Sequence, residues 1–186
     1  MEKYSFMSSK PNDNPTITQR IKLRAMEPED VDAIFAWEND PQIWVYNAAH
    51  QPFSRYALEK FIEEQSQSDI YTARQLRLMA ENDDGQRVGC IDLYDFDPYH
   101  KRAAIGVLTD NKMRGKGYGR MMLGAVENFA KEHIGIHQLH CAVSTSNTQS
   151  IRLFKSAGYT ESGVMKEWIY DNGNWVDALV FQKIID

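Results

Sequence analysis

Cysteine is scarce in this sequence, which contains two, Cys90 and Cys141, among 186 residues. Each lies within an apolar run, so each is expected to be a small core residue rather than half of a disulfide. The histidines are scattered along the chain without the spacing of a ligand set. A disulfide framework and a zinc site are therefore not expected, and no metal is predicted.

Long apolar runs and an excess of positive charge are also lacking. No stretch reaches the length of a membrane span, and the polar segment 1–19, with Pro11 and Pro15, has no apolar stretch typical of a signal peptide. The net charge of −5, from 21 Lys and Arg against 26 Asp and Glu, argues against general nucleic-acid binding, which needs a basic face. These features predict a cytoplasmic protein without a nucleic-acid or membrane partner.

The chain is long enough for one compact domain. We expect a loose tail over residues 1–19 and a single domain over 20–186. The spacing of apolar residues predicts strands over 20–24, 76–80, 88–96, 102–109, 139–143, 165–170 and 175–184, and helices over 28–37, 56–67, 118–133 and 150–156. Several consecutive strands are connected as hairpins, which favours a mixed α/β domain around one sheet over a doubly wound fold.

The most informative stretch is Arg114-Gly115-Lys116-Gly117-Tyr118-Gly119-Arg120, which follows a predicted strand and opens a long helix. Its three alternating glycines permit a tight turn and a close approach of the backbone to a ligand. The free N–H groups and the dipole of a helix start form an anion site, and the three basic side chains add positive charge. A diphosphate is the ligand that this arrangement favours.

Two common diphosphate motifs do not fit. In a P-loop, the Gly-Lys pair is followed by Ser or Thr, but Lys116 is followed by Gly117. A dinucleotide fingerprint has a later third glycine and an early place in a βαβ unit. A plain glycine-rich turn at a helix start is the remaining structural alternative.

The stretch resembles the signature of the GNAT superfamily of N-acetyltransferases: Gln or Arg, two residues, Gly, one residue, then Gly or Ala. Arg114, Gly117 and Gly119 match it in place, and the Trp-Glu-Asn-Asp-Pro sequence at 37–41 is similar to the ribosomal-protein and polyamine acetyltransferase branches. The resemblance covers roughly residues 21–184. It implies a mixed, mostly antiparallel central sheet flanked by helices, with a V-shaped splay of two strands that holds acetyl-CoA as cosubstrate.

The resemblance also implies roles for individual residues. Stretch 114–120 would bind the pyrophosphate of coenzyme A, and the backbone of Val107, Leu108 and Thr109 would pair with the pantetheine arm. A backbone N–H near that strand would polarise the thioester carbonyl. Asn147 would bind the pantetheine amides, with Ser150 beside it, although Asn147 is equally suited to cap the helix that contains Ser150.

Phe154 departs from the family pattern, although we count it among the residues that contact the cofactor. Many relatives have a tyrosine at this place, as general acid to the departing thiolate. Phenylalanine has no proton to donate, so another group or water protonates the thiolate, or no acid is needed. Tyr159 follows Gly158 at a place where the family has an aromatic core residue.

Asp92 is the candidate catalytic residue. It lies in an otherwise apolar strand, where a carboxylate is costly to bury without a partner. It could act as general base or as the anchor of a substrate ammonium, or it could be a hydrogen-bonded strand residue. In a regular strand Asp92, Tyr94 and Phe96 share one face.

Three functions remain open from the sequence. The first is acetylation of a primary amine on a small molecule such as a diamine, polyamine or amino sugar. The second is acetylation of a protein N-terminus or lysine, and the third is a coenzyme A-binding sensor without turnover, which the phenylalanine at 154 keeps open. The segment 45–51 contains no carboxylate, which counts against spermidine as the acceptor. A homodimer is compatible with the resemblance.

Overall fold

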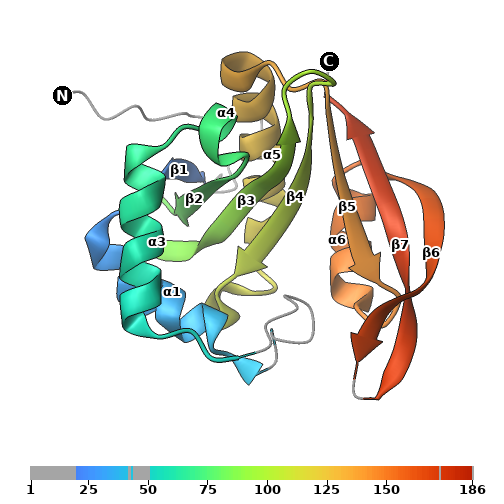
Figure 1. Ribbon diagram of the computed structural model, residues 1–186, viewed down its shortest axis with the longest axis horizontal. Coiled ribbons are helices and arrows are strands. Elements are labelled where there is room, and N and C mark those ends of the chain that lie inside the picture. The colour runs from blue at the N-terminus through green and yellow to red at the C-terminus, as the bar shows by residue number, and fades with distance from the viewer. Residues whose placement is uncertain (1–19, 42, 44–50, 172, 186) are drawn as a thin grey trace, which may run out of the picture.

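The computed structural model describes residues 20–41, 43, 51–171 and 173–185. The expected tail 1–19, and the segment 45–51 except for Gln51, lie outside these residues. One seven-stranded sheet runs through the fold in the order β1-β2-β3-β4-β5-β7-β6 (Figure 1). Its strands are β1 (Lys22–Ala25), β2 (Leu76–Glu81), β3 (Arg87–Asp97), β4 (Arg102–Thr109), β5 (Gln138–Ser144), β6 (Thr160–Asp171) and β7 (Asn174–Ile184).

Helices cover both faces of this sheet. The helices are α1 (Val31–Glu38), α3 (Arg55–Gln67), α4 (Ile70–Ala73), α5 (Tyr118–Phe129) and α6 (Thr148–Ser156), with a π-helical turn, Ala130–Ile134, after α5. In Figure 1, α1 and α3 lie in front of the sheet and α5 lies behind it. The sequence predicted these helices except α4, a single turn capped by Asp69, whose side chain accepts from Thr72 N.

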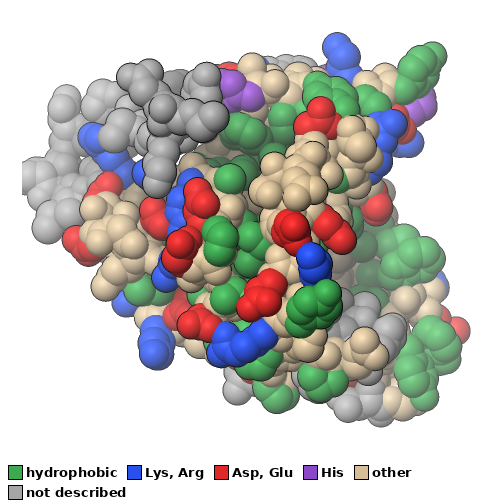
Figure 2. Space-filling model, turned by 60° about the vertical axis from the view of Figure 1, so that its left-hand side comes forward, with side chains coloured by type: hydrophobic (Ala, Val, Ile, Leu, Met, Phe, Trp, Pro, Cys, Tyr) green, Lys and Arg blue, Asp and Glu red, His purple; other side chains and the backbone are tan. Residues whose placement is uncertain are grey.

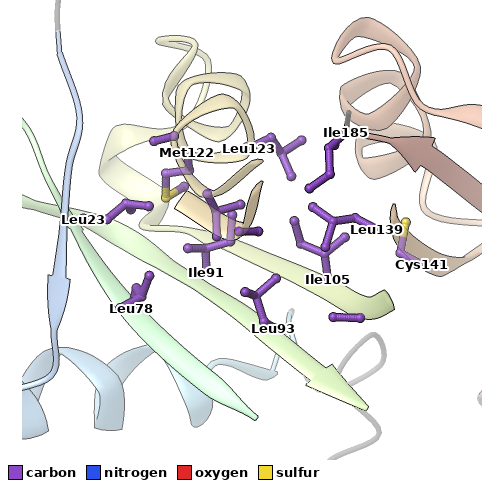
Figure 3. Close-up of a cluster of buried hydrophobic side chains, with 14 of the residues drawn as sticks. Leu23, Leu78, Ile91, Leu93, Ile105, Met122, Leu123, Leu139, Cys141 and Ile185 are labelled. Carbon is purple, nitrogen blue, oxygen red and sulfur yellow. The ribbon is translucent and has the colours of Figure 1, made fainter. Parts of the chain in front are cut away.

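The alternation of apolar residues along the strands divides the core between the two faces. Ile91 and Leu93 of β3 belong to the larger cluster, which packs against α5, as Figure 3 shows. Met79 and Cys90 belong to the smaller cluster beneath α1 and α3. Cys141 is buried as well, and burial raises the pKa of both thiols to about 12. The prediction that the cysteines are core residues is confirmed.

A bulge in β3 corrects one prediction. Asp95 has a φ of 50°, and the register between β3 and β4 shifts between Tyr94 and Asp97. The extra residue turns Phe96 into the core beside Leu93, whereas Tyr94 and Asp92 stay on the opposite face, over Gly106. The expectation that Asp92, Tyr94 and Phe96 share a face is therefore wrong for Phe96.

Strands β4 and β5 diverge. They pair in parallel only at their first residues, where Arg102, Ala103 and Ala104 face Gln138, Leu139 and His140, and the other neighbouring strand pairs are antiparallel. Beyond these pairs the two strands separate, and both line one cavity. The predicted fold, a mostly antiparallel sheet with a V-shaped splay, is confirmed.

Candidate active site

The splay between β4 and β5 opens into a cavity of about 940 Å³. Residues of β2, β3, β4, β5, α3 and α6 contribute to its walls. The structure brings together at this cavity many of the residues singled out from the sequence, namely Asp92, Val107, Leu108, Thr109, Arg114, Asn147, Ser150 and Phe154. An elongated ligand can thus contact the strand, the helix and the carboxylate at once.

Of the glycine stretch, Arg114 lines the cavity, whereas residues 115–120 are not among the lining residues and lead into α5. Gly115 and Gly117 have φ angles of 76° and 84°, a backbone conformation that L residues with side chains rarely adopt. Arg114 Nε donates to the carbonyl oxygen of Thr109 at 3.3 Å, which ties the stretch to the end of β4. Lys116 and Arg120 are exposed. Because the first N–H groups of a helix have no intrahelical acceptor, this end of α5 can bind an anion.

Two residues of the stretch pack against the protein. The Tyr118 side chain is buried, and its hydroxyl accepts from Asn82 Nδ2 at 3.4 Å. A Cβ added to Gly119 would lie 3.1 Å from a Leu153 methyl carbon, so this glycine permits close packing of α5 on α6. At Tyr118 and Gly119 only the backbone N–H groups are suited to contact a ligand.

Asn147 caps α6, since its Oδ1 accepts from Ser150 N at 3.0 Å. Both residues also line the cavity. The cap occupies the side-chain oxygen of Asn147 and leaves its amide N–H groups to donate elsewhere. Capping and ligand contact are therefore compatible at this position.

Phe154 forms part of the cavity wall and is held by other rings. It packs edge-on against Tyr159, with ring centroids 5.1 Å apart, and stacks on Phe181 at 6.2 Å. Tyr159 is itself buried, and burial, followed by the nearby Glu127 carboxylate, raises the pKa of its hydroxyl far above its usual value. Tyr159 is therefore unsuited to replace the missing acid.

Asp92 lies directly opposite Arg77 in the β2–β3 ladder, and the two side chains form a bidentate ion pair. Arg77 Nε donates to Asp92 Oδ1 at 2.6 Å, and Nη2 donates to Oδ2 at 3.0 Å. Arg77 Nη1 donates to Glu38, the last residue of α1. Although burial acts to lower it, the pKa of Arg77 is raised well above its usual value, chiefly by Asp92. Arg77 is therefore charged throughout the ordinary pH range.

Sequence reasoning missed Arg77 and Glu38, which both line the cavity. One signal was available for each of them. Arg77 interrupts the apolar run of β2 just as Asp92 interrupts that of β3, and Glu38 lies within the Trp-Glu-Asn-Asp-Pro sequence. Trp37 of the same sequence donates from Nε1 to Asp110 Oδ2 at 2.8 Å, which fixes the end of α1 against the residue that follows β4.

The described residues contain no group of three His, Cys, Asp or Glu side chains placed to hold a metal ion. None of the helices that the structure describes is long and apolar enough to cross a membrane. On the face shown in Figure 2, acidic and basic side chains lie interspersed rather than separated by sign.

A helix start suited to an anion, two splayed strands and the cavity between them are together suited to an acyl carrier with a diphosphate and an extended arm. Residues 20–160 match the family described as "Acetyltransferase (GNAT) domain", so the chain belongs to this family. It is an N-acetyltransferase that uses acetyl-CoA as its cosubstrate.

Known relatives agree with this assignment. The uncharacterised prophage-derived N-acetyltransferase YokL of Bacillus subtilis is 26% identical over 163 residues, which are 88% of this chain and 89% of YokL. The spermidine N(1)-acetyltransferase of Vibrio cholerae is 21% identical over 87% of this chain and 91% of its own. A crystal structure of a V. cholerae spermidine N-acetyltransferase with CoA and spermine has a TM-score of 0.79 at 21% identity, covering 88% of this chain and 95% of that one.

Proposed function

We propose that this enzyme acetylates the primary amine of a small molecule, such as a diamine, polyamine or amino sugar, and that the amine binds on the Asp92 side of the cavity. Glu38 and Asp92 line the cavity there, and so do the apolar residues Leu58 and Phe61 of α3. Carboxylates attract an ammonium, and the apolar wall suits the carbon frame of a small acceptor. Relatives named as spermidine acetyltransferases favour a small molecule over a protein acceptor or a sensor.

Acetyl-CoA binds, in this proposal, between the two arms of the V, β4 and β5. Its pyrophosphate lies at the start of α5, at stretch 114–120, where Arg114, Lys116 and Arg120 supply positive charge. The pantetheine arm extends along the backbone of 107–109, and the Asn147 amide donates to it. The thioester then lies within the cavity near Phe154, where a backbone N–H polarises its carbonyl.

The reaction needs a free amine, because an ammonium has no lone pair with which to attack the thioester. Both oxygens of Asp92 already accept from Arg77, which makes this carboxylate better suited to anchor the ammonium than to remove its proton. Water in the open cavity takes that proton. The departing thiolate is a good leaving group, so a phenylalanine at 154 is compatible with turnover.

The observation that carries the proposal is the meeting of Arg114, the splayed strands and the carboxylates at one cavity. Gly117→Asp places bulk and a negative charge at the pyrophosphate, and titration calorimetry should show a large loss of acetyl-CoA affinity. Gly173→Asp, at the turn between β6 and β7, is the matched control, because Gly173 also has a φ of 84° and a Cβ there meets nothing within 4 Å. Unchanged binding by a folded Gly117→Asp variant would contradict the placement.

A thiol-release screen across amines, polyamines and peptides tests the acceptor class. Release with small amines but not with peptides supports the proposal. Release only with peptides would assign the protein-acetylating alternative, and acetyl-CoA binding without release from any acceptor would assign the sensor.

We also propose that the chain forms a homodimer and acts in the cytoplasm. Val164, Trp168, Tyr170 and Trp175 are exposed on the β6–β7 hairpin, and β6 is an edge strand of the sheet. A related V. cholerae enzyme is described as dodecameric. Sedimentation of the wild type and of a Trp168→Glu variant tests the assembly.

The proposed location rests on the cysteines. Cys90 and Cys141 are buried and free, which fits a reducing compartment such as the cytoplasm.

A further inference from the structure

A short turn joins the two parts of the proposed cofactor site. Residues 107–109 end β4, and the glycine stretch 114–120 follows directly after the 3₁₀ turn Asn111–Met113. Thr109 and Arg114, on either side of this turn, both line the cavity. The path of the turn therefore sets the position of the glycine stretch relative to the end of β4.

Asp110 holds this turn through all four of its hydrogen-bonding groups. Its N–H donates to the Val88 carbonyl oxygen at 2.9 Å, and its own carbonyl oxygen accepts from Met113 N at 2.9 Å. Its Oδ1 accepts from Lys112 N at 2.8 Å, and its Oδ2 accepts from Trp37 Nε1 at 2.8 Å. Three of these bonds lie within the turn or between β3 and the end of β4, whereas the bond from Trp37 comes from α1.

The indole of Trp37 is a rigid donor. Trp37 is 6% exposed and packs in the smaller core cluster, which also contains Ile34 and Met79. An indole has one N–H and no acceptor, so the core fixes the direction in which this N–H points. Asn111 Nδ2 donates to Asp40 Oδ2 at 2.6 Å, which is a second contact between the turn and the end of α1. Helix α1 thus holds the turn from outside the cavity.

We propose that Trp37 and Asp110 are positioning residues for acetyl-CoA. Neither is among the residues that line the cavity, so they act through the turn. Their bond keeps the end of β4 and the glycine stretch at the separation that lets one cofactor contact both with its pantetheine arm and its pyrophosphate. This inference rests on the proposed function, because it takes residues 107–109 and 114–120 as the cofactor site.

Trp37→Phe tests the inference, because it removes the N–H and keeps an aromatic ring in the core. Titration calorimetry should show a Kd for acetyl-CoA raised at least about tenfold. The KM for acetyl-CoA should rise with it, while kcat at saturating acetyl-CoA stays within about twofold of the wild type. A bond that only stabilised the fold would leave this KM unchanged.

Ile34→Val is the matched control. Ile34 is fully buried in the same helix and the same cluster as Trp37, so its shortening lowers stability without removing the hydrogen bond. The acetyl-CoA affinity of Ile34→Val should equal that of the wild type. An equal loss of affinity in Ile34→Val and Trp37→Phe would assign the effect to general destabilisation and overturn the inference.

Asp110→Asn is the second variant, and it decides the question if Trp37→Phe does not fold. Its amide N–H groups replace one acceptor oxygen and face the N–H of either Trp37 or Lys112, so the Kd for acetyl-CoA should rise as in Trp37→Phe. The double variant should bind acetyl-CoA about as weakly as Asp110→Asn alone, because a shared bond is lost only once.

Two further results would overturn the inference. One is wild-type acetyl-CoA affinity in a folded Trp37→Phe or Asp110→Asn variant, and the other is losses that multiply in the double variant, since the two residues would then act independently. Wild-type affinity in a folded Gly117→Asp variant contradicts instead the proposed placement of the cofactor, so the two failures are distinguishable.

Discussion

Gly89 of β3 lies against the main chain of Leu108 on β4. A Cβ added to Gly89 would fall 2.0 Å from the Leu108 carbonyl oxygen, a distance that no side chain can occupy. Leu108 and its neighbour Thr109 are the residues that we propose for the pantetheine arm. The bare backbone of Gly89 therefore lets the end of β4 lie where the cofactor needs it.

Gly89→Ala should destabilise the protein and weaken acetyl-CoA binding, because β4 must move away from the new methyl group. Forcing an extra carbon into a packed site costs about 1–3 kcal/mol, measurable by urea unfolding. Gly124→Ala in α5 is the control, since a Cβ there meets nothing within 4 Å. An unchanged unfolding midpoint for Gly89→Ala would show that β4 adjusts at no cost.

Phe154→Tyr should fold normally and raise turnover, because it places a hydroxyl at the cavity wall where we propose that the thiolate departs. The pH profile of kcat should change, while the KM for acetyl-CoA stays similar. Phe181→Tyr, in the fully buried ring that stacks on Phe154, should change stability rather than rate. If Phe154→Tyr matches the wild type in rate and pH profile, then either residue 154 is distant from the sulfur or the reaction needs no acid.

Local sequence signals were sufficient for much of the fold and for the backbone conformation of the glycine stretch. Each predicted strand appears within a few residues of its expected bounds, except that β6 begins at Thr160 rather than Met165. The glycines at 115 and 117 have the left-handed backbone that their residue type favours. These features depend on short-range sterics and on alternation, which a single sequence records.

The acceptor end depends on contacts between distant parts of the chain. Arg77 and Asp92 meet only because β2 and β3 pair in one particular register, and Glu38 joins them because α1 packs over that face. The bulge at Asp95 reverses the orientation of Phe96. The φ of 50° at Asp95 could not be predicted from the residue type. Periodicity cannot supply register or bulges, so the pairing of Asp92 with Arg77 was not predictable, although both residues interrupt apolar strands.

We expect Asp30 to make the stability of the fold depend on pH in the acid range. Its side chain is fully buried, and burial acts to raise the pKa of the carboxyl group. Hydrogen bonds from Arg24, the Glu27 N–H and Arg87 outweigh this effect and lower the pKa from 3.8 to about 2. Because the folded value lies below the unfolded one, the ionised carboxylate stabilises the fold fully above about pH 5, and this stabilisation is lost as pH falls towards 2.

Asp30→Asn should therefore cost about 2 kcal/mol of stability at neutral pH and reduce the loss of stability in acid. Urea unfolding at neutral pH and near pH 3 measures both effects. The matched control is Asp32→Asn, since the Asp32 side chain is 77% exposed and surface ion pairs contribute at most about 1 kcal/mol. Equal acid sensitivity in Asp30→Asn and the wild type would place the response elsewhere.

Asp92→Asn keeps the shape of the side chain and removes the charge that we propose as the ammonium anchor. The kcat/KM for the amine should fall at least about tenfold, which corresponds to about 1.4 kcal/mol, while acetyl-CoA affinity stays the same. An anchor acts mainly through KM and a general base mainly through kcat, so the two constants separate these roles. Asp84→Asn, at the exposed β2–β3 turn, makes the same substitution as a control. Wild-type kinetics in a folded Asp92→Asn variant would leave Asp92 only its structural pairing with Arg77.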